Sequence, residues 1–250
     1  MKKQLLDKFY KARTKTVVVS ENNVLLERFV TINYLKKYIK PDSYIAEIGA
    51  GIRAYSPDIS KFAKHITAVD LFQDNLDRLS KQIKTNNFDT LCADVLDLAS
   101  IKSDSFNVVF VNGPMSHLFT TKERLQAIKE SCRICKKGGF VLFNYLTNTP
   151  IIYRSGLIKG DVKAFAKYAH RTEQDIYATY FVNEFNELVP KTLKHVTDIS
   201  LDGLFEILKE YTNKLDQATF NKIKQMQLQI AERSDMIGCS SHVISVYKKL

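Results

Sequence analysis

The stretch AEIGAGIRAYS, Ala46 to Ser56, combines a carboxylate with a glycine-rich turn. An apolar run, then G-x-G-x-x-A, then a polar segment is typical of a strand that turns into a helix. Glu47 stands two residues before Gly49, and Asp70 follows 23 positions after Glu47. An acid at about that separation commonly binds ribose hydroxyls. The spacing therefore predicts a cofactor that contains a nucleoside.

Two nucleoside cofactors fit this pattern. A dinucleotide would place its pyrophosphate at the N-terminus of the helix after the glycines, with Ala54 as the third small residue. S-adenosylmethionine has no phosphate, and its methionine part carries an ammonium, a carboxylate and a sulfonium. The carboxylate of Glu47 suits the ammonium, directly or through water, and would repel a pyrophosphate. Glu47 therefore favours S-adenosylmethionine over NAD.

The elements that must position these residues alternate along the chain. Apolar runs predict strands at 44–49, 66–70, 90–94, 106–113 and 140–146, and helical patterns lie near 55–64, 73–85 and 121–136. Short apolar strands separated by helices are typical of a parallel sheet covered on both faces. We expect a doubly wound α/β fold, in which ligands bind outside the carboxyl ends of the strands.

Further helices and strands are expected before and after these five strands. Ser20 is expected to cap a helix that runs to about Ile39 and ends at Pro41. Residues 147–181 interrupt the alternation and predict a helical insertion, placed after the fifth strand where it would close over the site as a lid. A helix at 182–188, a strand near 192–199, two helices across 202–232 and a strand at 241–249 follow. Acceptor selection is expected of this segment as a whole, since each residue taken singly is typical of a surface aromatic or a solvated charge. The residues concerned are Tyr153, Arg154, Tyr168, His170, Arg171, Tyr177 and Tyr180.

Motifs over nearly the whole chain resemble those of class I S-adenosylmethionine-dependent methyltransferases. AEIGAGIRAYS resembles the first motif, ITAVDLFQDNLDRL the second and CADVLDL the third, and FNVVFVNGPMSHL resembles the fourth strand with its loop. The resemblance implies a mostly parallel, seven-stranded Rossmann-like sheet in a single methyltransferase domain, 1–250. Within it we expect an N-terminal helical cap (1–43), a cofactor-binding core (44–146), a lid-like insertion (147–181) and a C-terminal part (182–250).

The resemblance also assigns roles within the motifs. Asp70 is expected on the ribose and Leu71 against the adenine, whose edge Asp94 and Val95 would contact. The full set of expected cofactor-binding residues is Glu47, Gly49, Ala50, Gly51, Tyr55, Asp70, Leu71, Asp94, Val95 and Asn112. No metal site is expected.

The loop after the fourth strand resembles that of one particular subgroup of these methyltransferases. Its sequence GPMSHL, Gly113 to Leu118, is similar to the G-P-L-Y-H-L of a bacterial subgroup of presumed small-molecule methyltransferases, and the tail ERSDMIGCSSHVISVYKK is similar to that subgroup's ending. Transfer of a methyl group from a sulfonium is an in-line displacement that needs a base only if the acceptor arrives protonated. His117 is the expected base, with capping of the next helix or ordering of the loop as its alternative role.

Arg53 departs from the family pattern because it occupies the position of the third glycine. The side chain either points outward or occludes the methionine pocket, and we expect the outward arrangement. An RNA or protein methyltransferase, and a cofactor-binding member without catalysis, stay open as alternatives. Asn112-Gly113-Pro114-Met115 resembles the Asn-Pro-Pro-Tyr of nucleic-acid methyltransferases only weakly.

Composition and charge limit the partners and the location that are expected for the protein. The 250-residue chain is 45% apolar and 26% charged, with a net charge of +10 from dispersed lysines and arginines. Dispersed charge makes nucleic acid an unlikely partner. With no secretory signal and no apolar run of about 18 residues, a cytoplasmic protein without a membrane partner is expected. Cys132-x-x-Cys135 is expected to place two small residues on one helix face, and His242 is expected to be structural.

Overall fold

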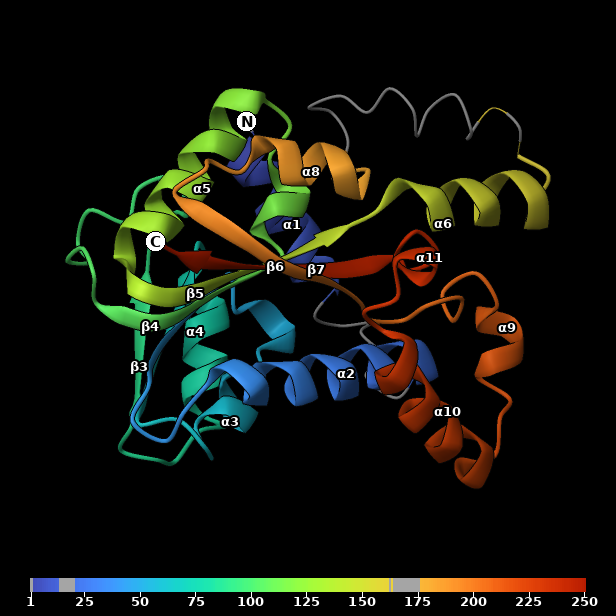
Figure 1. Ribbon diagram of the computed structural model, residues 1–250, viewed down its shortest axis with the longest axis horizontal. Helices are drawn as coiled ribbons and strands as arrows, with labels where there is room; N and C mark the ends of the chain where they lie inside the picture. Colours follow the sequence, from blue (N-terminus) through green and yellow to red (C-terminus); the bar gives the residue numbers. More distant parts are fainter. Residues whose placement is uncertain (1, 14–20, 162, 164–175) are drawn as a thin grey trace. The chain divides into compact units, whose positions relative to one another are not determined.

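The computed structural model describes the chain except for residues 1, 14–20, 162 and 164–175 (Figure 1). The described residues form two compact units, each built from several chain segments. Unit 1 draws on Met1–Thr31, Tyr145–Phe185 and Asp198–Ile244, and unit 2 on Ile32–Asn144, Asn186–Thr197 and Ser245–Leu250. The candidate cofactor residues all belong to unit 2, whereas the expected lid and His242 belong to unit 1.

Seven strands form one sheet in the order β3-β2-β1-β4-β5-β7-β6. Strands β1 to β5 run parallel to one another. The Leu201 amide donates to the His242 carbonyl and the Leu250 amide to the Thr192 carbonyl, so β6 and β7 run in opposite directions. The strands are β1 (Tyr44–Ile48), β2 (His65–Asp70), β3 (Phe88–Cys92), β4 (Phe106–Asn112), β5 (Cys135–Leu146), β6 (Leu193–Ser200) and β7 (His242–Lys249).

The central strands of unit 2 are buried along most of their length. Ile45, Val108 and Val109 are fully inaccessible, as are residues on β5 such as Leu142. Burial of successive residues means that both faces of these strands are covered, which is why they read as continuous apolar runs rather than alternating ones. The predicted α/β class with a mostly parallel seven-stranded sheet is confirmed.

Three helices follow the strands of unit 2. Helices α3 (Ser56–Ile59) and α4 (Gln73–Ser80) follow β1 and β2, and α5 (Thr121–Ile134) follows the loop after β4. In Figure 1, α5 lies on the opposite side of these strands from α3 and α4. Helix α5 begins with a capping box, in which the Thr120 side chain accepts from the Glu123 amide and Glu123 accepts from the Thr120 amide.

Unit 1 contains the other helices and an aromatic cluster. The Tyr145 ring stacks on Phe185 with centroids 4.1 Å apart, and Tyr180 meets both rings edge-on. Helix α2 begins in unit 1 and α8 begins there too, and both end in unit 2. The remaining elements are α1 (Lys2–Arg13), α2 (Asn22–Tyr38), α6 (Asn148–Tyr153), the π-helical turn Arg154–Ile158, α8 (Val182–Leu188), α9 (Lys209–Thr212), α10 (Gln217–Ile230) and α11 (Ser234–Ile237).

Three details differ from the expectations. The helix expected at 55–64 is reduced to α3, and the one expected at 73–85 ends at Ser80. Cys135 is the first residue of β5, so placing both cysteines of the C-x-x-C on one helix face was wrong. Asp94 lies beyond the end of β3, in an isolated bridge with Asp97. The expected cap at Ser20 and the insertion residues Tyr168, His170 and Arg171 lie outside the described residues.

Candidate functional site

The glycine-rich turn after β1 is packed directly against the loop after β4. Gly49 has a φ of +79°, and a Cβ added there would lie 2.4 Å from Cδ of Pro114 and 2.7 Å from the Asn112 carbonyl oxygen. The Gly49 and Ala50 amides both donate to the Val69 carbonyl on β2. Only glycine allows both this backbone conformation and this approach. The turn is therefore held between the ends of β2 and β4.

Glu47 fixes the second half of the turn. One carboxylate oxygen accepts from the Tyr55 amide at 2.8 Å, and the other accepts from the Ser56 amide at 2.7 Å and from the Ser56 hydroxyl. Burial raises the pKa of Glu47, and these hydrogen bonds act against that rise. The side chain is completely buried and its oxygens are taken by the loop. Direct contact between Glu47 and a ligand ammonium stays a prediction, and in this structure Glu47 organises the turn.

Asp70 links the ends of β1 and β2. Its Oδ2 accepts from the Gly51 amide at 2.7 Å, and its Oδ1 accepts from the Phe72 amide at 2.9 Å and from Asn75 Nδ2 at 3.0 Å. Burial raises the pKa of Asp70 while these donors lower it. Since a carboxylate has about four acceptor positions, one position is left for a further donor. A ribose hydroxyl is such a donor.

Two asparagines extend this network across β4 and β5. Asn112 Nδ2 lies 3.4 Å from Glu47 Oε1, and Asn144 Nδ2 donates to Asn112 Oδ1 at 3.0 Å. The Oδ1 atom of Asn144 is buried and has no hydrogen-bond partner among the described residues. A buried acceptor without a partner is costly, and a ligand that donates to it would remove that cost. Sequence reasoning missed Asn144, although it is the one polar residue in the apolar run FVLFNYL.

The residues expected around the adenine lie after β2 and β3, which are neighbours in the sheet. Leu71 directly follows β2 and is half-buried, and Val95 is buried. The Asp94 carboxylate accepts from the Leu96 amide at 2.9 Å and so closes a turn of its own loop. The structure thus brings two apolar side chains and one carboxylate to the ends of adjacent strands.

Two further candidates lie on the loops of this site. His117 ends the 3-10 turn Pro114–His117, the same turn whose proline packs on Gly49, and it is half-buried. Arg53 ends the 3-10 turn Gly51–Arg53 after β1 and is also half-buried. Arg53 makes no hydrogen bond or ion pair with any residue in the described part of the chain. Its charge is therefore balanced by nothing in that part of the protein.

The described residues contain no group of three or more His, Cys, Asp or Glu side chains placed to hold a metal ion. None of the described helices combines the length and the apolar composition needed to cross a bilayer.

A family model described as "Methyltransferase domain" matches residues 46–143. This segment contains the glycine turn, Asp70, Asp94 and the loop with His117. Residues 46–143 are therefore similar to the methyltransferase domains that this model describes. The protein is accordingly an enzyme of the transferase class. A search of curated proteins finds no match to the chain.

Solved methyltransferases share the fold of the chain at low sequence identity. The N-methyltransferase NodS from Bradyrhizobium japonicum is 11% identical, with 93% of this chain and 99% of that chain aligned and a TM-score of 0.56. A possible histamine N-methyltransferase from Thermotoga maritima is 18% identical, with 90% and 92% aligned and a TM-score of 0.57. Phosphoethanolamine N-methyltransferase 1 from Haemonchus contortus is 12% identical, with 100% and 49% aligned and a TM-score of 0.64.

Proposed function

We propose that this methyltransferase transfers a methyl group from S-adenosylmethionine to a small-molecule acceptor by in-line displacement. The observation that carries the proposal is the junction of Asp70 with Gly51, which places a buried carboxylate with one spare acceptor position at the carboxyl end of β2. In an open parallel sheet that end is where ligands bind.

The residues of the site fit the cofactor. Asp70 would accept from a ribose hydroxyl, and Leu71 and Val95 offer apolar surface to an adenine ring. Gly51 leaves room beside Asp70, because a Cβ added there would meet only Asp70 Oδ2, at 4.0 Å. The unpartnered Asn144 Oδ1 is suited to a donor such as the methionine ammonium. The site therefore offers hydrogen-bond acceptors for hydroxyl and ammonium groups. S-adenosylmethionine carries both kinds of group.

Glu47 disfavours a dinucleotide. Its buried carboxylate lies directly before the glycine turn, next to which a pyrophosphate would have to lie. A carboxylate repels that dianion, and burial strengthens the repulsion by lowering the local dielectric.

When bound, the cofactor supplies an electrophilic methyl group on a sulfonium, and the protein supplies orientation and exclusion of water. Glu47 and Asp70 hold the turn, and the Gly49–Pro114 contact fixes the loop that bears His117. His117 is the base that the motif GPMSHL offers for an acceptor that arrives protonated.

A small acceptor is supported by the similarity of GPMSHL and of the C-terminal tail to the small-molecule subgroup. Structural neighbours include enzymes named for phosphoethanolamine and for geranyl diphosphate, and another neighbour is a putative methyltransferase in complex with the Trm112 methyltransferase activator. The division into cap, core, lid-like insertion and C-terminal part belongs to this proposal, with the insertion selecting the acceptor.

The proposal is tested with S-adenosylhomocysteine, S-adenosylmethionine and NAD, each in a thermal unfolding series. A ligand that binds only the folded state raises the unfolding temperature by mass action. We expect both adenosyl ligands to stabilise the protein in a concentration-dependent manner and NAD to have no effect. Stabilisation by NAD alone would contradict the proposal.

A second candidate function is cofactor binding without catalysis, and Arg53 is the observation that favours it. Arg53 lies on the cofactor turn and has no partner among the described residues, so its guanidinium can occupy the methionine end of the site. Single-turnover transfer of a tritiated methyl group to a panel of small amines, phenols and thiols distinguishes the two functions.

A further inference from the structure

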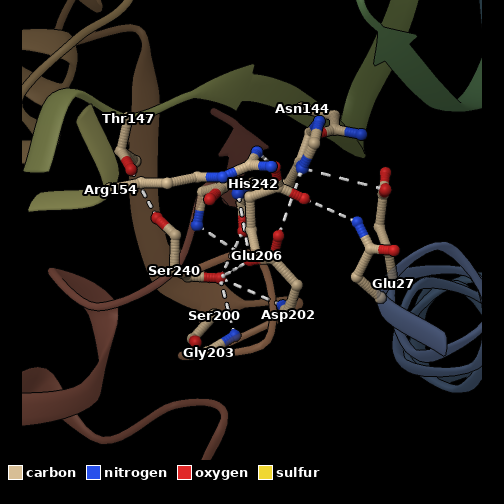
Figure 2. A network of polar contacts seen from close by, with 12 residues as sticks. Glu27, Asn144, Thr147, Arg154, Ser200, Asp202, Gly203, Glu206, Ser240 and His242 are labelled. Atoms are coloured by element: carbon tan, nitrogen blue, oxygen red, sulfur yellow. Dashed lines mark hydrogen bonds and ion pairs between the residues drawn. The ribbon is translucent and has the colours of Figure 1, made fainter. Parts of the chain in front are cut away.

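Asn144 is a buried polar side chain of the candidate site that offers a hydrogen-bond acceptor to a ligand. It lies near the carboxyl end of β5 and is labelled in Figure 2. Its register partner on β4 is Asn112, and both residues belong to unit 2, as do the expected cofactor residues. Only 3% of Asn144 is exposed, and no donor in the described part of the chain reaches its Oδ1 atom. This orphaned oxygen is the feature that a ligand can satisfy.

Glu47 sets the direction in which the two amides point. A carboxylate only accepts hydrogen bonds, so Asn112 presents its Nδ2 group to Glu47 Oε1, at 3.4 Å. The Oδ1 atom of Asn112 then accepts from Asn144 Nδ2 at 3.0 Å. Asn144 is left with its oxygen, and not its nitrogen, as the atom available to a ligand. The chain of hydrogen bonds therefore makes this position selective for a ligand atom that donates.

The order of the strands associates Asn144 with the methyl acceptor. The residues expected around the adenine follow β2 and β3, and the glycine turn follows β1. Strand β4 is the next neighbour of β1 in the sheet, and β5 lies beyond β4. An acceptor that approaches from the side away from the adenosine therefore meets β5. A carbonyl oxygen accepts two hydrogen bonds, so a contact with the methionine ammonium still leaves Asn144 one position for the acceptor.

The chemistry of methyl transfer indicates which atom can donate to this oxygen. Oxygen and sulfur nucleophiles attack as anions, which have lost the proton that they could donate. An amine attacks through its lone pair while it still carries N–H groups. These groups become stronger donors as positive charge develops on the nitrogen, so a fixed acceptor oxygen stabilises the transition state more than the ground state. The same oxygen would repel an anionic nucleophile.

We propose that the methyl acceptor is a primary or secondary amine whose N–H group donates to Asn144 Oδ1 during the transfer. This inference rests on the proposed methyl transfer. The lone pair of the nitrogen forms the new N–C bond, and the electron pair of the broken S–C bond goes to sulfur. The product ammonium then releases one proton to water. An amine that arrives protonated must first lose a proton, which is the role proposed for His117.

The first test needs neither the acceptor nor catalysis. Sinefungin is an analogue of S-adenosylmethionine in which a carbon bearing an amino group replaces the sulfur and its methyl group. Its N–H groups therefore lie beside the position of the acceptor nitrogen. We define the sinefungin preference as the dissociation constant of S-adenosylhomocysteine divided by that of sinefungin. By calorimetry we expect a wild-type preference of about 10-fold or more, as for a hydrogen bond from a charged group.

Two variants separate the oxygen of Asn144 from its other roles. Asn144→Leu removes the oxygen at similar size, and its sinefungin preference should fall to near one. Asn144→Asp keeps an acceptor oxygen and should keep the preference. A contact with the methionine ammonium is common to both ligands and cancels in the ratio. An unchanged preference in Asn144→Leu, or no preference in the wild type, would overturn the proposal. Failure of S-adenosylhomocysteine to bind the wild type would instead contradict the proposed function itself.

Asn87→Leu is the matched control. Asn87 also has a buried Oδ1 atom without a partner among the described residues, and its Nδ2 donates to the carbonyls of Ser60 and Ala63. It directly precedes β3, at the amino edge of the parallel strands, whereas Asn144 lies near their carboxyl edge. Its sinefungin preference should equal that of the wild type. A fall as large as that in Asn144→Leu would overturn the role of Asn144.

A polar network within unit 1 provides a second control, for loss of stability (Figure 2). Nδ1 of His242, at the start of β7, lies 3.4 Å from Oδ2 of Asp202 and 3.8 Å from Oε2 of Glu27. Asp202 is only 2% exposed, and its Oδ1 accepts from the Ser241 amide at 2.8 Å and from the Ser240 hydroxyl at 2.5 Å. His242→Gln should destabilise the protein without changing the sinefungin preference. A loss of the preference there would attribute the effect to stability and overturn the proposal.

The second test identifies the atom that is methylated. The wild type is incubated with tritiated S-adenosylmethionine and with small amines, phenols and thiols that share the same aromatic frame, and the products are separated by chromatography. We expect label on nitrogen only, and a rate that rises with pH until the amine is fully deprotonated. Label on oxygen, sulfur or carbon would overturn the proposal.

Discussion

Gly49 illustrates at the residue scale how one glycine holds two loops of the site together. Its φ of +79° and the 2.4 Å approach of Pro114 to an added Cβ are separate reasons for glycine. Gly138 allows these two reasons to be tested separately. Its φ is also positive, at +77°, but a Cβ added there would meet nothing within 4 Å.

We expect Gly138→Ala to destabilise the protein by roughly 1–2 kcal/mol, the cost of the backbone conformation. Gly49→Ala should cost about 1–3 kcal/mol more, since Pro114 or the turn must also move. Urea unfolding of both variants measures the difference. Equal destabilisation would mean that the Gly49–Pro114 contact relaxes without cost.

Asp70 is the residue on which cofactor affinity should depend most. Asp70→Asn keeps the shape but removes the charge that a ribose hydroxyl would contact. A hydrogen bond to a charged group contributes about 1.5–3 kcal/mol, so S-adenosylhomocysteine should bind about 10- to 100-fold more weakly by calorimetry. Asp77→Asn, on the exposed face of α4, is the control and should bind normally. An unchanged dissociation constant in Asp70→Asn would remove Asp70 from the site.

Arg53 is expected to point away from the methionine end of the cofactor. Gly49 and Gly51 still form the turn, and Glu47 still fixes its second half. Arg53→Gly should therefore change the dissociation constant of S-adenosylhomocysteine by no more than about threefold. Tightening by tenfold or more, about 1.4 kcal/mol, would show that the arginine occupies the pocket.

Sequence reasoning located the turn and Asp70 because their spacing is local to two consecutive strand–helix units. It could not show that both oxygens of Glu47 are occupied, since that depends on how the chain bends at Tyr55 and Ser56. It also missed the Asp202–His242–Glu27 contacts. Their members are 40 to 215 positions apart, and no pattern in the sequence records such a meeting.

At the scale of elements, the strands were predictable and the helix ends less so. Five apolar runs gave five strands because parallel strands covered on both faces have continuous apolar sequences. The end of α5 was misplaced because Gly138 and Gly139 resemble a helix stop. They lie within β5 instead, where a Cβ on Gly139 would come 2.6 Å from the Asn107 carbonyl oxygen. Close packing against β4 explains that glycine.

The contacts of His242 join α2, the end of β6 and the start of β7, so they should make stability depend on pH. The folded pKa of about 9 lies above the unfolded value near 6.5. The stabilisation is therefore complete below about pH 6.5 and is lost as the pH rises through 9. Its size is on the order of 1–3 kcal/mol, given partial exposure of the ring.

Urea unfolding of the wild type and of His242→Gln at pH 6, 7.5 and 9.5 checks this expectation. The difference between the two proteins should shrink across the series, since other titrating groups are common to both. His65→Gln is the control for the loss of an imidazole that also faces a carboxylate, that of Asp89. A His242→Gln difference independent of pH would show that the folded imidazole titrates normally.

At the scale of the whole molecule, the net charge of +10 is the one feature that favours an RNA acceptor. Charge alone gives binding through phosphates, which releases counterions and weakens steeply with salt. The lysines are dispersed along the sequence, and several lie over aromatic rings, as Lys37 does over Tyr34 and Lys224 over Phe220. A lysine held over an aromatic ring by a cation–π interaction is less available to contact a phosphate.

We therefore expect only non-specific binding of RNA, with a dissociation constant of about 1–100 μM at physiological salt. Fluorescence anisotropy with a labelled transfer RNA and a labelled poly(A) of similar length, each from 50 to 300 mM salt, measures it. The two RNAs should bind alike and lose affinity in parallel as salt rises. Neither should compete with the small acceptors in the methyl-transfer assay. Nanomolar binding of one RNA at physiological salt, or its methylation, would replace the small-molecule acceptor by a nucleic acid.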